Sequence, residues 1–452
     1  MLRKASILLL FALASPAIAE PPFPSTYEAI SAGPALLRNA TVLTGDGQRL
    51  ENTDLLIAEG IIQWLGSGDV PAGTEEIDAS GRWVTPGLID VHSHLGVYPS
   101  PEVDAHSDGN ELTSPATPDV WAEHSIWTQD PGFARALAGG VTSLQVLPGS
   151  GNLFGGRGVT LKNVYSTSYQ DMKFPGAPHG LKMACGENPK SVYGPRNQAP
   201  STRMGNVAQY RAEWIAAQDY IAQWERYRAR TDAGDEEAVA PMRDLKLETL
   251  AGVLRGEIIV HMHCYRADEM MTILALAEEF NYRIGTFHHA VEAYKIADEL
   301  AENRVCGALW ADWWGFKMEA YDGIQENIAL VDRPANGCAI VHSDSPEGIQ
   351  RLNQEAAKAM GKGRRAGLNI TPENAIRWLT QNAARSLGIE EHTGTLAPGK
   401  MADVVVWSGD PFSVYSKADL VFVDGALLYD RADPARQPVS DFELGQLQEV
   451  AR

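Results

Sequence analysis

The strongest constraint on the fold is an alternation of short apolar runs with segments of helical period between residues 88 and 344. Helical segments such as 268–280, 290–302 and 347–360 follow several of these runs. Strands that alternate with helices favour parallel pairing, because each helix carries the chain back to the same end of the sheet. Eight such strands predict an α/β fold of the TIM (β/α)8 barrel type. The eight runs are residues 88–94, 141–148, 159–163, 181–187, 258–264, 283–289, 305–310 and 339–344.

Two segments depart from a regular barrel pattern. Between the second and third runs we expect no helix, because the glycine-rich stretch 149–158 lies there. Between the fourth and fifth runs there is a long polar insertion, residues 188–256. Its segment 207–230 has helical periodicity, and we expect it to pack on the barrel surface through Tyr210, Trp214 and Tyr220.

Both ends of the chain have short alternating runs separated by turn residues, which is typical of β structure. We expect residues 36–85 and 391–435 to form one small composite β domain, with the barrel, residues 86–390, inserted between its two parts. Residues 20–35 are rich in proline, serine and alanine and indicate a linker. Residues 436–452 are expected to form a C-terminal tail.

Residues 1–19 have the composition of a secretory signal peptide. Two basic residues precede an apolar run at 7–13, and the sequence Ala-Ile-Ala that ends at Ala19 matches a cleavage site. The run is too short to span a bilayer, although an uncleaved anchor stays open as the alternative. We therefore expect cleavage after Ala19 and export to a bacterial periplasm or beyond, without stable membrane insertion.

Composition narrows the class of partner. Hydrophobic residues make up 44% of the 452-residue chain, which is enough for a large core and excludes wholesale disorder. The formal net charge is −20, so the protein would repel phosphate backbones and anionic lipid headgroups. Nucleic-acid binding and electrostatic membrane docking are therefore disfavoured, and a small-molecule substrate is expected. The sequence leaves the oligomeric state open.

The four cysteines are too few for a disulfide scaffold, and none forms a CxxC pair. Each lies in an apolar run, which favours a small buried thiol. Pairing in an oxidising compartment stays open, because the sequence alone does not decide it. The four are Cys185, Cys264, Cys306 and Cys338.

Histidines are concentrated in the predicted strands. His92 and His94 are two residues apart, and His261 and His263 repeat that spacing. Because side chains alternate between the faces of a strand, both imidazoles of each pair lie on the same face. Two neutral imidazoles side by side can bind one divalent ion.

Two more strands carry the same kind of residue. His342 and Asp344 repeat the spacing of two, whereas His288 and His289 are adjacent, so that alternation lets only one of them face inward. A lone strand histidine is usually a hydrogen-bonded core residue. Several buried histidines at strand ends would each need a partner, at a cost of about 1–3 kcal/mol if unpaired, and a shared metal satisfies them together.

Several motifs resemble the amidohydrolase superfamily, in particular its imidazolonepropionase-like branch. The resemblance begins at VTPGLIDVHSHLG and covers nearly all of the chain after the signal peptide. It implies a metal-dependent hydrolase of carbon–nitrogen bonds on a distorted TIM barrel, with a composite β-sandwich domain. The other motifs are HCYRADEM, HHAVEAYKIADEL, HSDSPEGIQRLNQEAAKA and GTLAPGKMADVVVWSGDP.

The resemblance also implies roles for individual residues. His92 and His94 match the ligands of the more buried metal, His263 the strand-five ligand and His289 the strand-six ligand. Asp344 matches the strand-eight aspartate, which binds metal and acts as the general base. The implied cofactor is one or two divalent metal ions, with Zn²⁺ first and Mn²⁺ or Fe²⁺ as alternatives, since carboxylate and imidazole ligands suit several metals.

The ligand at the end of the fourth strand stays open between Lys182 and Glu187. Members with two metals have a bridging carboxylated lysine or a glutamate there. Lys182 fits the spacing of members with a carboxylated lysine, whereas Glu187 needs no modification and stands where the loop begins. If neither binds, the site holds one metal.

Substrate contacts are expected from the loops at the carboxyl face of the barrel. An arginine near the metal could hold a substrate carboxylate by a bidentate pair. A tryptophan in such a loop more often packs in the wall of the site or in the core than stacks on a substrate. The candidates are His261, Tyr265, Arg266, His288, Trp313 and Arg157.

The implied reaction is hydrolysis of an amide, cyclic amide or amidine bond, with Asp344 as general base. A dipeptidase-like or deaminase reaction on the same site is the alternative. A non-catalytic, envelope-associated binding protein is disfavoured, because a binder would have little reason to keep a base and every ligand. A Ser-His-Asp hydrolase is also disfavoured, because His342-Ser343-Asp344 is contiguous and no G-x-S-x-G elbow is present. The stretch GGRG, residues 155–158, lacks the lysine and helix of a nucleotide-binding loop.

Overall fold

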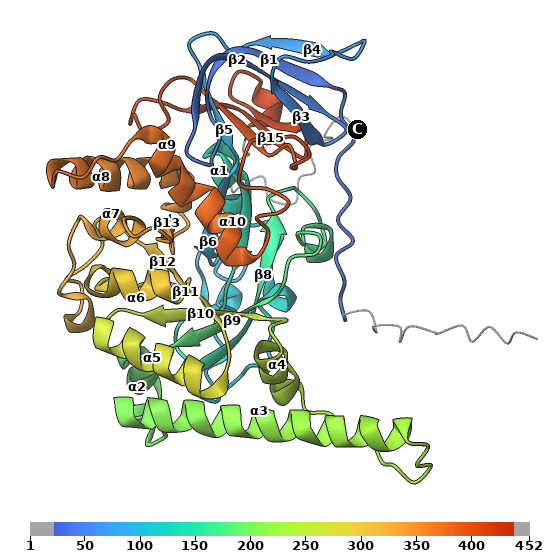
Figure 1. Ribbon diagram of the computed structural model, residues 1–452, viewed down its shortest axis with the longest axis vertical. Helices are drawn as coiled ribbons and strands as arrows, with labels where there is room; N and C mark the ends of the chain where they lie inside the picture. Colours follow the sequence, from blue (N-terminus) through green and yellow to red (C-terminus); the bar gives the residue numbers. More distant parts are fainter. Residues whose placement is uncertain (1–21, 438–452) are drawn as a thin grey trace, which may run out of the picture.

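The computed structural model describes residues 22–437, so the expected signal peptide and most of the expected C-terminal tail lie outside the described residues. Its centre is a nearly closed eight-stranded sheet in which neighbouring strands follow chain order (Figure 1). The bounds of all eight strands lie within five residues of those expected from the sequence, and the largest difference is at the start of the third strand. They are β6 (Leu88–Ser93), β7 (Val141–Val146), β8 (Phe154–Lys162), β9 (Gly180–Ala184), β10 (Ile259–Cys264), β11 (Ile284–His289), β12 (Cys306–Leu309) and β13 (Ala339–Val341).

One strand of this barrel, β8, runs opposite to the rest. It pairs antiparallel with both β7 and β9, and the other neighbouring pairs are parallel. The expectation of parallel pairing throughout was therefore wrong at this strand. Only residues 147–153 connect β7 to β8, and a parallel crossover needs a dozen residues or more. The glycine-rich segment 155–158 is consequently part of β8 and not a loop.

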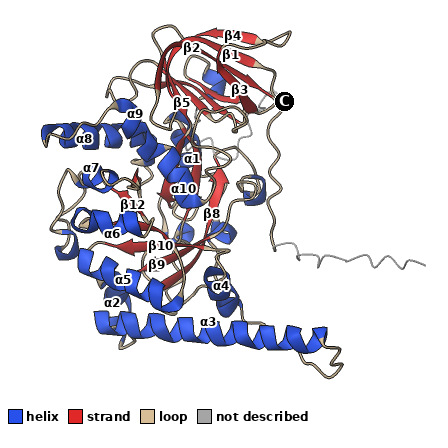
Figure 2. Ribbon diagram, in the orientation of Figure 1, coloured by secondary structure: helices blue, strands red, loops and turns tan. Residues whose placement is uncertain are grey.

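Helices cover the outside of the barrel (Figure 2). The side chain of Asp130 accepts the Gly132 N–H at the start of α1, and Pro131 occupies the first helical position. The helices that follow barrel strands are α1 (Pro131–Ala138), α5 (Ala267–Phe280), α6 (Ala297–Glu302), α7 (Asn327–Asp332), α8 (Leu352–Arg365), α9 (Pro372–Ala375) and α10 (Gln381–Leu387).

The insertion after β9 forms three helices, α2 (Glu187–Tyr193), α3 (Arg203–Asp232) and α4 (Leu245–Leu254). The long helix α3 lies at the end of the molecule opposite the β domain and extends past the barrel (Figure 1). It packs as expected, because the barrel-facing side chains of Tyr210, Trp214 and Tyr220 are all buried.

The β domain is one hydrogen-bonded sheet that combines strands from both ends of the chain, in the order β16-β15-β14-β5-β1-β2-β3, with β4 paired to β1. β14 joins the two parts by pairing antiparallel with β5, from Trp407 opposite Trp83 to Val404 opposite Pro86. The strands are β1 (Ala35–Leu43), β2 (Arg49–Ala58), β3 (Ile61–Gly66), β4 (Glu75–Asp78), β5 (Trp83–Pro86), β14 (Val404–Trp407), β15 (Ala418–Val423) and β16 (Ala426–Asp430).

A buried ionic network connects the barrel to the β domain. Lys162, the last residue of β8, places its Nζ 2.8 Å from Asp403 Oδ1 and 2.9 Å from Asp424 Oδ1. All three side chains are less than 5% exposed. The hydroxyl of Tyr27 donates a hydrogen bond to Asp424, so the segment before β1 also packs against this network.

The four cysteines are paired, which corrects the expectation of separate buried thiols. Cys185–Cys264 links the residue after β9 to the last residue of β10, whereas Cys306–Cys338 links the first residue of β12 to the residue before β13. Between them these disulfides fasten opposite ends of the barrel strands. Within residues 22–437, no helix combines the length and the apolar character that a membrane span needs.

Candidate active site

Histidines from β6, β10, β11 and β13 converge inside the barrel, at the carboxyl ends of the strands. The rings of His92 and His289 lie 4.7 Å apart between centroids, and those of His263 and His289 are equally close. The face expected from the spacing of two is therefore the interior face of the barrel. We call the following residues the histidine cluster: His92, His94, His263, His289, His342 and Asp344.

Two overlapping groups in the cluster have the convergence that a metal ion requires. The ligand atoms of His92, His94 and Asp344 lie within 4.8 Å of one another, and so do those of His92, His289 and His342. Asp344 Oδ1 is 3.1 Å from His94 Nε2 and 3.4 Å from His92 Nε2. Because His92 belongs to both groups, one or two cations could share it.

Both adjacent histidines of β11 reach the interior, so the expectation that only one could face inward was wrong. His288 contacts His92, with 2.9 Å between their Nδ1 atoms, and His289 contacts His342, with 2.9 Å between Nδ1 and Nε2. The backbone φ of His289 is +67°, in the left-handed region, which ends the strand alternation there. Asp344 has a similar φ of +54° at the end of the eighth strand.

The cluster contains buried donor atoms that no protein group satisfies. His263 is 2% exposed, yet neither of its ring nitrogens has a hydrogen-bond partner, and His342 Nδ1 is also unpartnered. An unpartnered buried polar atom costs about 1–3 kcal/mol. A cation that accepted these nitrogens as ligands would remove this cost, so the residues present fit a metal.

Burial also keeps the imidazoles neutral, as metal ligands must be. It depresses the pKa values of His92, His263 and His289 well below the ordinary value of 6.5, and nearby cationic groups, with Lys182 common to all three, add to the effect. Burial raises the pKa of Asp344, but the hydrogen bond from His94 and the neighbouring His94, His342 and Lys182 outweigh it, so its pKa is lowered. The cluster thus combines neutral nitrogens with an ionised carboxylate.

Lys182, one of the two candidates for the bridging ligand, points into this group. It is fully buried on β9, its Nζ lies 3.4 Å from His92 Nε2, and it donates a 2.9 Å hydrogen bond to the carbonyl of Pro148. Burial lowers the pKa of Lys182 to about 7, and Asp344 only partly opposes this. A large part of this amine is therefore uncharged near neutral pH, which is the form that reacts with carbon dioxide.

Glu187, the other candidate, is placed elsewhere. It begins α2 and pairs with Lys317, with 3.3 Å between Oε1 and Nζ, and its N–H donates to Glu319. No contact within the described residues links its carboxylate to the cluster. Of the two candidates that the sequence left open, the structure thus brings Lys182, and not Glu187, to the cluster.

Neighbouring side chains hold the cluster in place. Asp90, two residues before His92, accepts hydrogen bonds from the N–H groups of His92 and Ser343 at 3.2 Å and from the Ser343 hydroxyl. This ties β6 to the end of the eighth strand, where the sheet closes. The Trp310 ring stacks on His289, with centroids 4.3 Å apart, and its Nε1 donates to the Ser343 carbonyl.

The cluster is open on one side only. His92, His263, His289 and His342 are at most 2% exposed, whereas the side chains of His94 and Asp344 are 18% and 25% exposed. Solvent and substrate can therefore reach the carboxylate, while the opposite side of the cluster stays dry.

The other predicted substrate contacts fall into three places. Tyr265 lies at the cluster, with its ring 4.7 Å from His263. Arg266 pairs with Asp268 at the surface and does not reach the cluster. Trp313 is 41% exposed, and its ring contacts that of Trp310. Arg157 does not line the cluster, because its side chain contacts Trp121 and Thr249 outside the barrel.

His261 and His288 form a second layer beneath the cluster. His261 Nδ1 is 2.9 Å from His288 Nε2, and His261 Nε2 is 3.2 Å from the Gln145 side-chain nitrogen. A continuous line of contacts thus runs from Gln145 through both histidines to His92. Both histidines are fully buried, so they contact their neighbours in the barrel interior and not solvent.

Sequence reasoning missed Lys317 and Asp90. Lys317 lies in the loop after β12, with its Nζ 4.3 Å from the centre of the Tyr265 ring, and loop residues carry no periodic signal. Asp90 did carry a periodic signal, because it lies two residues before His92 and therefore on the same face of the strand as His92 and His94.

Comparisons with known proteins identify the family of this chain. The model of the amidohydrolase family matches residues 321–428. A solved amidohydrolase structure from Thermotoga maritima is 36% identical, with a TM-score of 0.79, and the match covers 88% of this chain and all of that one. The imidazolonepropionase of Maricaulis maris is 26% identical over 82% of this chain and 91% of its own length.

A longer protein is also similar. Amidohydrolase tasK of Hapsidospora irregularis is 31% identical over 88% of this chain, but this chain spans only 43% of its length. The chain belongs to the amidohydrolase superfamily and is related to imidazolonepropionases, as the sequence motifs predict. Membership also confirms the predicted enzyme class, hydrolases that act on carbon–nitrogen bonds.

Proposed function

We propose that this protein is an exported, metal-dependent amidohydrolase that cleaves an amide, cyclic amide or amidine bond in a small molecule. The observation that carries the proposal is the histidine cluster, in which neutral buried imidazoles surround one ionised carboxylate that solvent can reach. If these histidines served only to pack the core, the two ring nitrogens of His263 would not be buried without hydrogen-bond partners.

His92, His94, His263, His289 and Asp344 would hold one or two divalent cations, with zinc as the first expectation. Lys182, in carboxylated form, would bridge a second cation. Its position beside His92 and its lowered pKa support this role, since carbon dioxide adds only to the neutral amine. A bound divalent cation supplies Lewis acidity, which acidifies water and polarises a carbonyl group.

The protein's own residues would move the proton. Asp344 is ionised and partly exposed, so one of its oxygens can accept a proton from the attacking water and then pass it to the departing nitrogen. His94 Nδ1 donates a 2.8 Å hydrogen bond to the Leu147 carbonyl, which leaves its Nε2, 3.1 Å from Asp344 Oδ1, to bind the cation beside the carboxylate. Asp90 and Trp310 hold the backbone on either side of it through Ser343.

Export is supported by the two disulfides. Disulfides persist in oxidising compartments and are rare in the cytosol, and within the described residues every cysteine is paired. This fits the signal sequence that ends at Ala19, and it supports a periplasmic or extracellular location.

The decisive experiment compares the purified protein with Asp344→Asn. We expect metal to remain bound and kcat to fall by about 10²–10⁴-fold, the usual contribution of a general base. Substrates would come from a panel of N-acyl amino acids, dipeptides and cyclic ureides. Measuring amino-acid release against ammonia release separates a peptide hydrolase from a deaminase.

Asp312→Asn is the matched control, because Asp312 pairs with Lys358 at the surface and lies outside the cluster. Its turnover should equal that of the unmodified protein. Unchanged turnover in Asp344→Asn would refute the base assignment, and full activity after chelation would refute metal dependence.

A further inference from the structure

A second cavity lies outside the barrel wall formed by β8 and β9, and its volume is about 830 Å³. Its walls come from the N-terminal segment 22–25, the segment 119–124, β8, the loop 173–179 and α4. None of its lining residues belongs to the histidine cluster. In the β8–β9 pairing Arg157 is opposite Leu181, the neighbour of Lys182, so the cavity and the cluster lie on opposite faces of the same strand pair.

Arg157 places an unpaired cation in this cavity. Its Nε donates a 2.8 Å hydrogen bond to Thr249 Oγ1, and its guanidinium carbon lies 4.2 Å from the centre of the Trp121 ring. Within residues 22–437, its two terminal nitrogens have no hydrogen-bond or ion-pair partner. Burial lowers the pKa of Arg157 to about 10, although Glu123, Glu248 and Glu257 oppose this.

The other strong cations of the lining already have carboxylate partners. Arg243 pairs with Glu248 at 2.6 Å, and Arg255 pairs with Glu257 at 2.7 Å. Lys173 pairs with the buried Glu123 at 2.8 Å, and His179 contacts the same carboxylate. These carboxylates are therefore engaged and leave the terminal nitrogens of Arg157 available.

Asp119 provides an unpaired group of opposite charge. It lines the same cavity, and its Oδ1 is buried without a hydrogen-bond partner. No ion pair joins Asp119 to Arg157 within the part of the chain that the structure describes. A cavity that keeps one free cation and one free carboxylate apart fits a ligand that carries both charges.

The remaining lining is apolar and aromatic near these groups. The Phe23 ring meets Trp121 edge-on at 5.9 Å and His124 at 4.7 Å, and the Trp121 and His124 rings are stacked. The segment that carries Phe23 is fastened across the cavity rim, because Lys173 Nζ donates a 2.7 Å hydrogen bond to the Phe23 carbonyl. Such walls accommodate an aromatic or branched aliphatic side chain.

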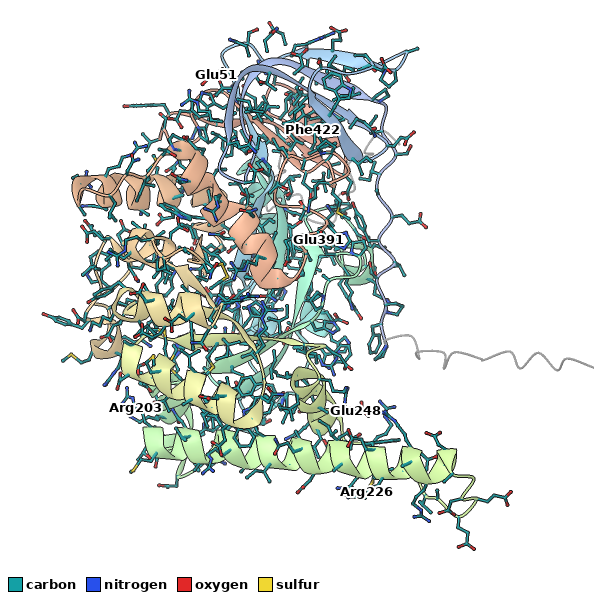
Figure 3. All side chains as sticks on the ribbon, viewed as in Figure 1. Glu51, Arg203, Arg226, Glu248, Glu391 and Phe422 are labelled. Carbon is teal, nitrogen blue, oxygen red and sulfur yellow. A yellow bond between two sulfur atoms is a disulfide. The ribbon has the colours of Figure 1, made fainter. Side chains whose placement is uncertain are left out.

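We propose that this cavity binds a free apolar α-amino acid, with its carboxylate on Arg157 and its ammonium group on Asp119. The cavity is distinct from the candidate active site. Glu248, which lines the cavity, lies on α4 beside the long helix α3 at the lower end of the molecule (Figure 3), and no residue of the histidine cluster lines the cavity. Binding here is therefore measurable without any turnover.

The test is calorimetric titration of the purified protein with L-phenylalanine, phenylacetate and phenethylamine. Phenylacetate lacks the ammonium group, and phenethylamine lacks the carboxylate. We expect L-phenylalanine to bind at least tenfold more tightly than either analogue. The titrations are run with metal loaded and after chelation, and the same result in both excludes binding at the histidine cluster.

Variants assign each charge. Arg157→Met should weaken L-phenylalanine binding at least tenfold and leave phenethylamine unchanged, whereas Asp119→Asn should do the same and leave phenylacetate unchanged. Arg211→Met, which removes a surface cation paired with Glu279 outside the cavity, should bind L-phenylalanine like the unmodified protein. If Arg157→Met does not fold, Arg157→Lys keeps the charge without the planar fork and should still weaken binding measurably.

The proposal fails if no saturable binding of L-phenylalanine or L-leucine occurs. It also fails if either analogue binds as tightly as L-phenylalanine, or if folded Arg157 and Asp119 variants keep full affinity.

Discussion

His289 and Asp344 adopt left-handed backbone conformations, with φ values of +67° and +54°, which are uncommon in residues other than glycine. Non-glycine residues in this region carry strain of about 1–3 kcal/mol, which persists only where the surroundings hold it in place. Here the Trp310 ring packs on His289, and the Asp344 N–H donates to the His92 carbonyl at 3.0 Å. These two conformations bring an imidazole nitrogen of His289 and the carboxylate of Asp344 into the cluster. In a regular strand both side chains would point elsewhere.

The bridging ligand gives the first residue-level prediction. Lys182→Gln should lower the metal content from two ions to one per chain and reduce kcat at least tenfold, because the amide cannot be carboxylated. Metal analysis and initial rates check both effects. Glu187→Gln is the matched control, since Glu187 pairs with Lys317 at the rim, and it should keep both ions and most of its activity. Loss of an ion in Glu187→Gln alone would reverse this assignment.

The sequence predicted most of the cluster, and the misses have a physical cause. Strand alternation predicted that His92, His94 and His263 share the interior face, because His92 and His263 lie in β6 and β10 and His94 directly follows β6. It could not predict that His288 and His289 both face the interior, because the left-handed φ of His289 interrupts the alternation of side chains along the strand. Lys317 gave no signal at all, because a loop has no period from which to infer direction.

At the scale of elements, the Cys185–Cys264 disulfide joins the ends of β9 and β10, three residues after Lys182 and one residue after His263. The Cys185 N–H also donates to the His263 carbonyl at 2.9 Å. The disulfide thus fixes the relative position of the two strands that contribute the bridging and strand-five ligands.

Removing each disulfide should separate stability from metal binding. Cys185→Ala/Cys264→Ala and Cys306→Ala/Cys338→Ala should each cost about 2–5 kcal/mol of unfolding free energy, the usual effect of losing a native disulfide. Only the first pair lies beside the cluster, so only its removal should also weaken zinc affinity. Urea denaturation and zinc titration against a chelating dye measure the two effects. Equal zinc affinity in both variants would show that the disulfide does not position the ligands.

A carboxylate pair links α5 to the loop after β12 and makes stability depend on pH. Arg203 Nε is 2.9 Å from Glu269 Oε1, and its NH2 group is 2.5 Å from Glu319 Oε1. Burial, followed by the neighbouring Glu319, raises the pKa of Glu269 to about 7, although Arg203 opposes this. The folded protein therefore binds more protons at this site than the unfolded chain between about pH 4.5 and 7.

The free energy of unfolding should therefore decrease as pH rises through that window. The reason is that the folded state binds the extra proton more tightly than the unfolded chain does, and rising pH removes it. Glu269→Gln cannot ionise, so its melting temperature should decline less than that of the unmodified protein between pH 5 and 7. Thermal unfolding at several pH values checks the difference. Glu279→Gln is the control, because Glu279 lies on the same helix as Glu269 but forms an exposed pair with Arg211 of α3. It should leave the change of melting temperature with pH unaltered. Parallel pH profiles for Glu269→Gln and the unmodified protein would contradict the assignment.

The order of elements was predictable, but the direction of β8 was not inferred. Apolar runs mark strands whichever way they run, and direction follows from the connection. The short link 147–153 contained the information, because seven residues cannot form a parallel crossover. Disulfide pairing was not predictable, since it depends on strand register, which brings Cys185 and Cys264 together from 79 positions apart.

At the scale of the whole molecule, strands from both chain ends form one sheet that must be held against the barrel. β5 and β6 are almost continuous in the chain, since only Gly87 separates them. The second connection is the network of Lys162 with Asp403 and Asp424. Asp403 also accepts hydrogen bonds from Thr393 Oγ1 and from the Asp424 N–H, so its charge is fully engaged.

Lys162→Met should therefore be one of the most destabilising single substitutions in the chain. It leaves Asp403 and Asp424 buried beside each other without a cation, and breaking a buried pair in this way costs about 3–5 kcal/mol. The measurement is the free energy of unfolding in urea at pH 7.

Arg38→Met is the matched control, because Arg38 also pairs with two carboxylates, Asp54 and Glu76, but at the surface. Its loss should cost no more than about 1 kcal/mol, because solvent screens exposed pairs. Lys162→Met/Asp403→Leu removes the cation together with one of the two carboxylates that it neutralises, so the double variant should recover part of the stability. If Lys162→Met costs no more than Arg38→Met, the network does not hold the β domain to the barrel, and the apolar contacts between them suffice.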